Sequence, residues 1–384
     1  MGVVLLLRKI LSTLMVSIFL FLPCLQCGAN TVEADVSAQS AVLIDLDNGR
    51  VYYEKNADAV LPMASTTKIM TALIVLESGF DLDEYFTVDS SAIMVEGSSM
   101  GLQKDDKVTL RTLCYGMLLP SGNDAANAAA VRVGGSIEGF CELMNERAKE
   151  MGLVNTCFKT PSGLDDENHH TTAKELATIA YCAMKNEDFK NICKCVTATV
   201  EFGNPPYKRT LYNHNRLLRA YDGTIGVKTG FTKKSGRCLV SAAQRNGVGL
   251  VCVTLNAPND WNDHKRLYNE GFNALAQLEL DDDSDYVMKV TGGTVSSVNL
   301  VLSQSPVATL SSGELEKVKK TVTIAPFAYA PVNCGDVLGE VVYAIDSTEL
   351  ARVELVAKTD VKRLEIEKNL FEELWDKILR LIKK

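Results

Sequence analysis

Short apolar runs separated by turn signals begin near residue 40. Residues 41–44 and 51–53 are apolar or aromatic, and they flank Asp47-Asn48-Gly49, so the pattern predicts a β-hairpin over 40–54. Apolar positions follow Ser65 as far as Leu76 and cover nearly the whole circumference of a helix. We predict that this helix lies inside the core, because a helix that is apolar on all sides needs burial on all sides.

The middle of the chain, residues 110–200, is predicted to be mostly helical, with an Ala-rich helix over 124–133. From there β structure is predicted to return at Gly223, and a helix over 263–278 follows it. The strands expected in this part are 223–232, 237–243 and 248–256. Strands on both sides of a helical middle, two of them joined by the turn Arg245-Asn246-Gly247, predict an α+β fold with an antiparallel sheet.

An acidic segment, 281–285, marks a domain boundary. Short alternating runs then lie between turn residues, at 298–301, 318–324, 337–343 and 350–356. They predict a small β-rich second domain. We place the first domain at 30–278 and the second at 279–362.

The first 29 residues have the pattern of a secretory signal. Arg8 and Lys9 precede an apolar run over 10–22, and the small residues Gly28 and Ala29 follow. The run is short for a membrane span, although an uncleaved N-terminal anchor is the alternative. We therefore expect an exported protein at the outer face of the cytoplasmic membrane.

The last 22 residues, 363–384, are predicted to be a membrane-associating helix. On a helical wheel, the apolar side chains of 369–384, with Phe371 and Trp375 among them, fill one half and the polar ones fill the other. Such a helix suits a membrane interface. Packing on the protein itself or against another chain is the alternative.

Bulk composition narrows the classes of partner. With 46% hydrophobic and 23% charged residues the chain is an ordinary globular protein, and its net charge of −8 argues against nucleic acid. Of the 11 cysteines, Cys24 and Cys27 lie in the signal region. We interpret the other nine as small buried hydrophobes rather than disulfide partners.

Three short motifs carry the candidate chemistry. The first is Ser65-Thr66-Thr67-Lys68 at the start of the buried helix. Ser65 and Lys68 share one helix face, and burial favours the neutral amine of Lys68, which can then take the Ser65 proton. A helix cap with a salt-bridged lysine is the alternative interpretation of this motif alone.

The second motif, Ser121-Gly122-Asn123, joins two predicted helices, where a hydroxyl can relay a proton and an amide can hold a substrate amide; a helix N-cap is its alternative. The third, Lys228-Thr229-Gly230, ends a predicted strand. A Lys/Thr pair suits a carboxylate, and the glycine lets a ligand approach the backbone; an exposed strand end is the alternative.

No metal site or cofactor is expected. The chain has four histidines, and none has metal-ligand spacing. His169 and His170 are predicted to be loop residues before a helix that starts near Thr172.

In residues, order and context the three motifs resemble those of the serine D-Ala-D-Ala carboxypeptidases, the low-molecular-mass penicillin-binding proteins. Leu61-Pro62-Met63-Ala64-Ser65 and Asn213-His214-Asn215 match the family as well. The resemblance covers about 38–275 and implies a β-lactamase/transpeptidase-like catalytic domain. The β-rich domain and the amphipathic tail also fit the family.

The resemblance implies a role for each motif residue. Ser65 would be the acylated nucleophile, Lys68 its base and Ser121 a proton shuttle. Asn123 would orient substrate, and the Lys228-Thr229-Gly230 motif would bind the terminal carboxylate. The backbone N–H groups of Ser65 and Phe231 would form the oxyanion hole. Peptidoglycan stem peptides ending in D-Ala-D-Ala would be substrates, and β-lactams would be covalent inhibitors.

Three other activities are compatible with parts of this pattern. A β-lactamase on the same fold is disfavoured by Gly122, where class A enzymes carry Asp, and by the second domain and tail. A catalytically inert peptidoglycan-binding protein is disfavoured because all motif residues are present. Endopeptidase or transpeptidase activity would use the same residues, and the sequence leaves it open.

Overall fold

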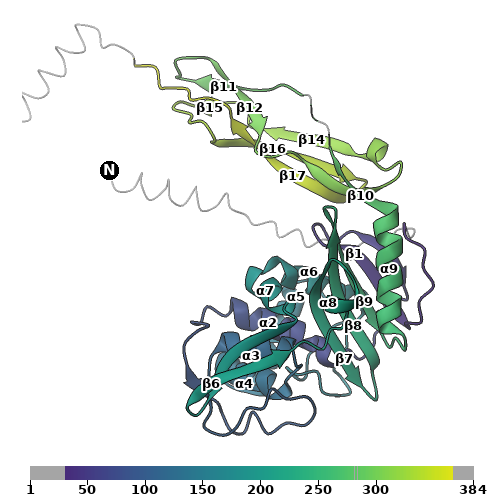
Figure 1. Ribbon diagram of the computed structural model, residues 1–384. Helices are drawn as coiled ribbons and strands as arrows, with labels where there is room; N and C mark the ends of the chain where they lie inside the picture. Colours follow the sequence, from purple (N-terminus) through teal and green to yellow (C-terminus); the bar gives the residue numbers. More distant parts are fainter. Residues whose placement is uncertain (1–30, 281, 283, 366–384) are drawn as a thin grey trace, which may run out of the picture. The chain divides into compact units, whose positions relative to one another are not determined.

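The computed structural model describes residues 31–280, 282 and 284–365, and divides the chain into two compact units between Ala276 and Gln277 (Figure 1). The predicted signal over 1–29 and the predicted helix over 369–384 lie outside the described residues. They stay predictions.

A five-stranded sheet forms the centre of the first unit, in the order β2-β1-β9-β8-β7 with neighbouring strands antiparallel. Its strands are β1 (Ser40–Asp45), β2 (Val51–Lys55), β7 (Thr224–Thr232), β8 (Gly236–Arg245) and β9 (Val248–Leu255). The predicted α+β class, the hairpin over 40–54 and the three strands after residue 223 are confirmed.

Helices cover both faces of this sheet (Figure 1). The helices described in this unit are α2 (Lys68–Glu77), α3 (Leu110–Leu118), α4 (Asn123–Gly134), α5 (Ile137–Glu150), α6 (Ala173–Lys185), α7 (Glu187–Cys193), α8 (Leu217–Ala220) and α9 (Asp260–Ala274). Helices α6 and α9 make the most contacts with the sheet, whereas α3, α4 and α5 pack mainly on other helices. Side chains alternate between the faces of a strand. Leu43 of β1 accordingly belongs to the apolar cluster with Leu267 of α9, whereas Val42 belongs to the cluster with α2 and α6.

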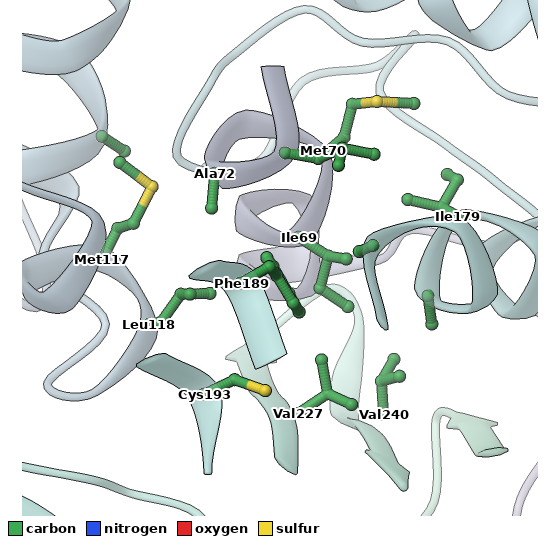
Figure 2. Close-up of a cluster of buried hydrophobic side chains, with 14 of the residues drawn as sticks. Ile69, Met70, Ala72, Met117, Leu118, Ile179, Phe189, Cys193, Val227 and Val240 are labelled. Atoms are coloured by element: carbon green, nitrogen blue, oxygen red, sulfur yellow. The ribbon is translucent and has the colours of Figure 1, made fainter. Parts of the chain in front are cut away.

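Helix α2 is buried on nearly every side, as its all-round apolar sequence predicts. Ile69, Met70 and Ala72 point in different directions and each contacts apolar side chains (Figure 2). The partners around them come from α3, α6, α7 and the sheet. The start of α2, where the first motif lies, is therefore fixed by packing on all sides.

Two predictions of secondary structure are wrong. β structure returns at Thr197 rather than Gly223, because β5 (Thr197–Gly203) and β6 (Pro206–Tyr212) form a hairpin. With β3 (Phe86–Thr87) and β4 (Lys107–Val108) they make a second small sheet. Most of the β5 and β6 side chains are at least partly exposed, so the hairpin lacks the apolar runs of the central strands.

The helix predicted over 263–278 runs from Asp260 to Ala274 instead. Leu275 is extended, with φ −116° and ψ 142°, and starts β10 (Leu275–Glu279). That strand pairs with β13 (Val307–Ser311), so strand pairing ends the helix early.

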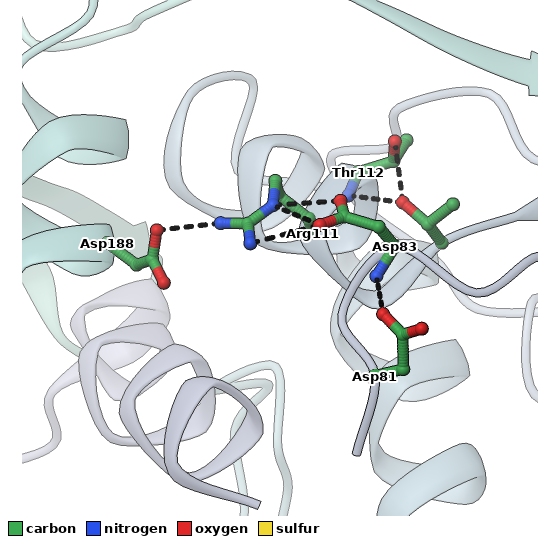
Figure 3. A network of polar contacts seen from close by, with 6 residues as sticks. Asp81, Asp83, Arg111, Thr112 and Asp188 are labelled. Carbon is green, nitrogen blue, oxygen red and sulfur yellow. Dashed lines mark hydrogen bonds and ion pairs between the residues drawn. The ribbon is translucent and has the colours of Figure 1, made fainter. Parts of the chain in front are cut away.

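A surface ion-pair network ties α3 to its surroundings (Figure 3). The Arg111 Nη1 donates to Asp188 of α7 at 2.7 Å, and its Nε donates to Asp83 at 2.9 Å. Exposed pairs of this kind contribute about 0–1 kcal/mol each, so the network orients α3 more than it stabilises the unit.

The second unit is β-rich, as predicted, with a six-stranded sheet in the order β14-β16-β17-β12-β11-β15. The strands are β11 (Tyr286–Thr291), β12 (Ser297–Leu302), β14 (Lys319–Ile324), β15 (Ala328–Tyr329), β16 (Val337–Ile345) and β17 (Thr348–Ala357). The unit has an apolar core of its own, which includes Val341, Leu355 and Val361.

All nine cysteines of the described residues are free, and Cys114, Cys193, Cys238 and Cys252 are completely buried. Cys141 is buried as well, whereas Cys157, Cys182 and Cys195 are half-buried and Cys334 is exposed. The interpretation as free cysteines therefore holds for all nine, but the interpretation as buried apolar side chains holds for five of them. Over residues 31–365, apart from 281 and 283, no helix is both long and apolar enough to cross a membrane.

A buried polar network joins α9 to the central sheet. The His264 Nδ1 lies 2.6 Å from the Ser241 Oγ of β8, and its Nε2 lies 3.0 Å from the Thr254 Oγ1 of β9. The Tyr268 hydroxyl lies 2.6 Å from the same Ser241 oxygen. Burial lowers the pKa of His264 to about 3, so the ring is neutral in the folded protein.

This burial predicts acid sensitivity of the first unit. The ordinary histidine pKa is about 6.5, well above the pKa of His264 in the folded protein. Between these two pKa values the unfolded chain binds more protons than the folded one, so the free energy of unfolding decreases as the pH is lowered. We expect His264 alone to lower the free energy of unfolding by roughly 2 kcal/mol between pH 7 and pH 5. Urea unfolding at the two pH values measures it. An equal loss in the H264Q variant would contradict the assignment.

Candidate active site

Ser65 lies in a tight 3-10 turn, Ala64–Thr67, directly before α2. Ala64 has a φ of +50°, an uncommon conformation for a residue with a side chain. Two hydroxyls stabilise the turn, since Thr66 Oγ1 donates to the Met63 carbonyl at 2.6 Å and Thr67 Oγ1 donates to the Ala64 carbonyl at 2.8 Å. The helix proper starts at Lys68, so the serine precedes the helix instead of opening it.

The Lys68 amine is completely buried and lies among three oxygens. Its Nζ is 3.0 Å from Ser65 Oγ, 2.7 Å from Asn123 Oδ1 and 2.6 Å from the Ser162 carbonyl oxygen. The Asn123 amide is oriented because its Nδ2 donates to the Glu96 carbonyl at 2.7 Å, which turns Oδ1 toward Lys68. Two of the three oxygens can only accept a hydrogen bond.

The protonation state of Lys68 follows from this position. Burial, together with repulsion from Lys228, holds the pKa of Lys68 well below its ordinary value. A neutral amine has two N–H groups and one lone pair. In the structure Lys68 Nζ donates to all three oxygens; a neutral amine would keep its N–H groups on the two acceptor oxygens and would turn its lone pair toward the Ser65 hydroxyl.

The second motif is held in a strained connection between α3 and α4. Ser121 is 4% exposed and has a φ of +64°, a conformation that costs of order 1–3 kcal/mol in a non-glycine residue. Backbone bonds fix the connection, with Gly122 N–H donating to the Gly116 carbonyl and Asn123 N–H to the Ser98 carbonyl. Strain maintained by its surroundings is frequent at functional sites.

The third motif lies in β7, an edge strand of the five-stranded sheet. Lys228 is 1% exposed, and its Nζ donates to the Thr229 carbonyl at 2.8 Å. Burial lowers the pKa of Lys228 to about 7. His214 lies nearby: its N–H donates to the Leu119 carbonyl, and burial together with the Lys228 charge lowers the pKa of its ring.

Gly230 brings β7 close to the serine turn. A Cβ on Gly230 would lie 3.1 Å from the Met63 carbonyl oxygen and 3.2 Å from the Ser65 nitrogen, which is tighter than most real contacts. The next residue, Phe231, is 65% exposed. The glycine therefore permits the backbone of the third motif to approach the backbone of the first.

Three contributions to this arrangement were missed in the sequence. The Ser162 carbonyl bonds Lys68, yet a backbone acceptor has no side-chain signature. Gly163 packs on the turn so closely that a Cβ there would lie 2.0 Å from the Ala64 carbonyl oxygen. Its only signal was the Pro161-Ser162-Gly163 turn sequence.

The third missed residue is His169, which precedes α6 in a loop as predicted but is buried. Its Nε2 lies 2.7 Å from Thr67 Oγ1, and its Nδ1 accepts the Lys159 N–H at 3.0 Å. Burial lowers its pKa to about 4, so the neutral ring donates to Thr67. Asp124, directly after the second motif, similarly accepts backbone N–H groups of Met100, Gly101 and Leu102.

The structure thus brings Ser65, Lys68 and Asn123 within hydrogen-bond distance and places Gly230 against the Ser65 turn. The substrate contacts of Asn123, Thr229 and Lys228 and the proton relay through Ser121 stay predictions. Within the described ranges, no three His, Cys, Asp or Glu side chains gather into a metal-binding group.

Comparisons with known proteins agree with this geometry. Residues 28–259 match the family described as D-alanyl-D-alanine carboxypeptidase, and residues 281–363 match the penicillin-binding protein 5 C-terminal domain. The D-alanyl-D-alanine carboxypeptidase DacF of Bacillus subtilis is 33% identical over 374 residues, covering 93% of this chain and 95% of the relative.

Solved structures show the same fold. Penicillin binding protein 5 from Haemophilus influenzae superposes with a TM-score of 0.66 at 29% identity, covering 88% of this chain and all of that one. The Streptomyces K15 DD-transpeptidase covers 63% of this chain and 99% of its own length, with a TM-score of 0.60 and 34% identity. The chain belongs to the D-alanyl-D-alanine carboxypeptidase family of serine hydrolases.

Proposed function

We propose that this enzyme removes the terminal D-Ala from peptidoglycan stem pentapeptides through an acyl-enzyme on Ser65. The observation that carries the proposal is the Lys68 amine, buried and 3.0 Å from the Ser65 hydroxyl. A lysine that two fixed acceptors keep oriented, and that burial keeps neutral, can act as a general base for the adjacent serine.

In the first step Ser65 Oγ attacks the carbonyl carbon of the penultimate D-Ala, and its proton passes to Lys68 Nζ. The carbonyl oxygen becomes an oxyanion, which the backbone N–H groups of Ser65 and Phe231 would stabilise. The approach of Gly230 to the Ser65 nitrogen supports this pairing. One oxyanion donor of this kind typically contributes about 10²–10³ in rate.

In the second step the C–N bond breaks, and the leaving D-Ala amine takes a proton relayed from Lys68 by the Ser121 hydroxyl. Lys228 and Thr229 would bind the carboxylate of that D-Ala. With a pKa of about 7, Lys228 is partly neutral before substrate binds. A bound carboxylate favours the charged form of Lys228, so the ion pair between them forms when the substrate binds.

Water then attacks the acyl carbon and releases the shortened peptide and Ser65. A β-lactam presents a similar carbonyl and carboxylate, so it would acylate the same serine and leave slowly. Asn123, whose Oδ1 bonds Lys68, is proposed to contact the substrate amide once Lys68 is protonated and shifts its hydrogen bonds. The acyl-enzyme lifetime on penicillin separates this reaction from that of a β-lactamase.

Transpeptidation or endopeptidase activity is the second candidate, because a relative of similar fold is named a DD-transpeptidase. In either reaction the acyl-enzyme on Ser65 is the same and the acceptor or donor peptide differs. Product analysis therefore distinguishes them better than inhibition does.

We further propose that the enzyme acts outside the cytoplasm, with residues 1–29 as its export signal and 369–384 as a helix lying in the membrane surface. Two features support this location: the predicted apolar half of 369–384, and the proposed substrate of the enzyme, which is a cell-wall peptide.

Replacing the nucleophile tests the proposed reaction. We expect S65A to lower kcat/KM on a D-Ala-D-Ala pentapeptide by a factor on the order of 10⁴ or more and to abolish covalent labelling by penicillin, since the proposed ester forms on the Ser65 hydroxyl. The control is S78A, at the other end of α2, where Ser78 Oγ donates to the Val75 carbonyl at 2.7 Å and accepts the Phe80 N–H at 3.5 Å. Labelled S65A protein would refute the nucleophile assignment.

The wild-type products decide between the candidate reactions. We expect free D-Ala and a tetrapeptide, with no change in cross-linked dimers supplied in the same assay. Cleavage of the dimers, or formation of new cross-links, would favour the second candidate.

Removing residues 365–384 tests the proposed membrane attachment. We expect the truncated protein to lose sedimentation with lipid vesicles and to keep its activity on a soluble peptide, because the residues of the candidate site all belong to the first unit, which ends at Ala276. Unchanged vesicle binding would show that the tail is not the anchor.

A further inference from the structure

Two aromatic side chains of the second unit lie against each other and are nevertheless exposed. The rings of Phe327 and Tyr329 meet edge to face, with centroids 5.2 Å apart. The two residues are 44% and 71% exposed. Large aromatic side chains usually bury most of their surface, so an exposed pair indicates a contact surface.

Backbone pairing brings two more exposed apolar residues to the same end of the sheet. Tyr329 pairs with Thr291 at the end of β11, and the loop that follows carries Val295, which is 53% exposed. The N–H of Leu364, also 53% exposed, donates to the Gly292 carbonyl at 2.8 Å. We call Val295, Phe327, Tyr329 and Leu364 the aromatic end.

The charges around the aromatic end are mostly positive. The segments 286–297, 325–333 and 360–365 carry three cations, Lys289, Lys362 and Arg363, against two anions, Asp360 and Glu365. All five of these residues are exposed. This end therefore carries a net charge of +1 in a chain whose net charge is −8.

The described part of the second unit ends at Glu365, directly after Leu364 of the aromatic end. From Leu364 to residue 369 the chain spans five residue steps, which reach at most about 17 Å when fully extended. If the tail helix lies in a membrane interface, the aromatic end is within that distance of the same interface.

We propose that the aromatic end docks into the headgroup region of an anionic lipid bilayer, as a second membrane contact beside the tail. Aromatic side chains favour the interface, and the three cations favour anionic lipids. The inference rests on the proposed attachment of residues 369–384, because that attachment places the bilayer here. Once one of the two contacts is bound, it keeps the other close to the bilayer, so the two together give a higher affinity for the membrane than either alone.

Vesicle sedimentation of the full chain without residues 1–29 tests this, with vesicles of phosphatidylglycerol and phosphatidylcholine as the probe. The test variant is F327S/Y329S. The matched control is V287S/V322S, which removes two exposed apolar side chains, one of them on β14 at the opposite edge of the sheet. Thermal unfolding checks that both variants fold, and each is also made without residues 365–384.

We expect F327S/Y329S to lower the partition coefficient about tenfold and V287S/V322S to leave it unchanged. Loss on tail removal with no effect of F327S/Y329S would overturn the inference and leave the proposed attachment standing. If F327S/Y329S lowered binding and removal of residues 365–384 did not, the proposed attachment of the tail would be overturned and the aromatic end would stand as a membrane contact. Equal losses of vesicle binding in F327S/Y329S and V287S/V322S would show a non-specific effect and would overturn the inference. A dimer in solution that F327S/Y329S dissociates and V287S/V322S does not would assign the aromatic end to a protein contact and would also overturn it.

Discussion

The site depends on one buried amine whose hydrogen bonds are fixed in advance. Lys68 Nζ contacts Ser65 Oγ, Asn123 Oδ1 and the Ser162 carbonyl oxygen, and no water-exposed surface remains on the residue. Burial makes the charged form costly, and the repulsion from Lys228 adds to that cost. The same arrangement therefore favours the neutral amine and holds it beside the Ser65 hydroxyl, as the proposed role of Lys68 as general base requires.

The rest of the first unit holds the partners of that amine in position. Apolar packing around α2 fixes the lysine, whereas two glycines let neighbouring segments approach the serine turn closely. Gly163 lies against the Ala64 carbonyl, and Gly230 of β7 lies against the Ser65 nitrogen. Either glycine given a side chain would push the turn away from the strand or the loop. The serine turn, the loop at Gly163 and strand β7 at Gly230 therefore pack more closely than residues with a side chain at these two positions would permit.

The sequence predicted the features that follow from the pattern and identity of side chains. The all-round apolar pattern of 69–76 predicted a buried helix, and the resemblance of the three motifs to one family implied that Ser65, Lys68 and Asn123 serve one site. The hydrogen bond between Lys68 and Asn123 was not predicted. The Ser162 carbonyl and the cap that Asp124 forms on residues 100–102 could not be predicted, because backbone acceptors and loop caps follow from tertiary contacts. The hairpin of β5 and β6 was missed for a related reason: most of its side chains are partly or fully exposed, so its apolar signal is weak.

The protonation state of the Lys68 amine decides whether the site works as proposed, and its titration can be followed directly. In protein labelled with ¹³C at the lysine ε-carbon, the Lys68 signal is assigned by its absence in K68R, and its shift is recorded against pH. We predict a midpoint well below the ordinary lysine value of about 10.4, separate from that of the exposed lysines. A Lys68 signal that titrates together with the exposed lysines would contradict it.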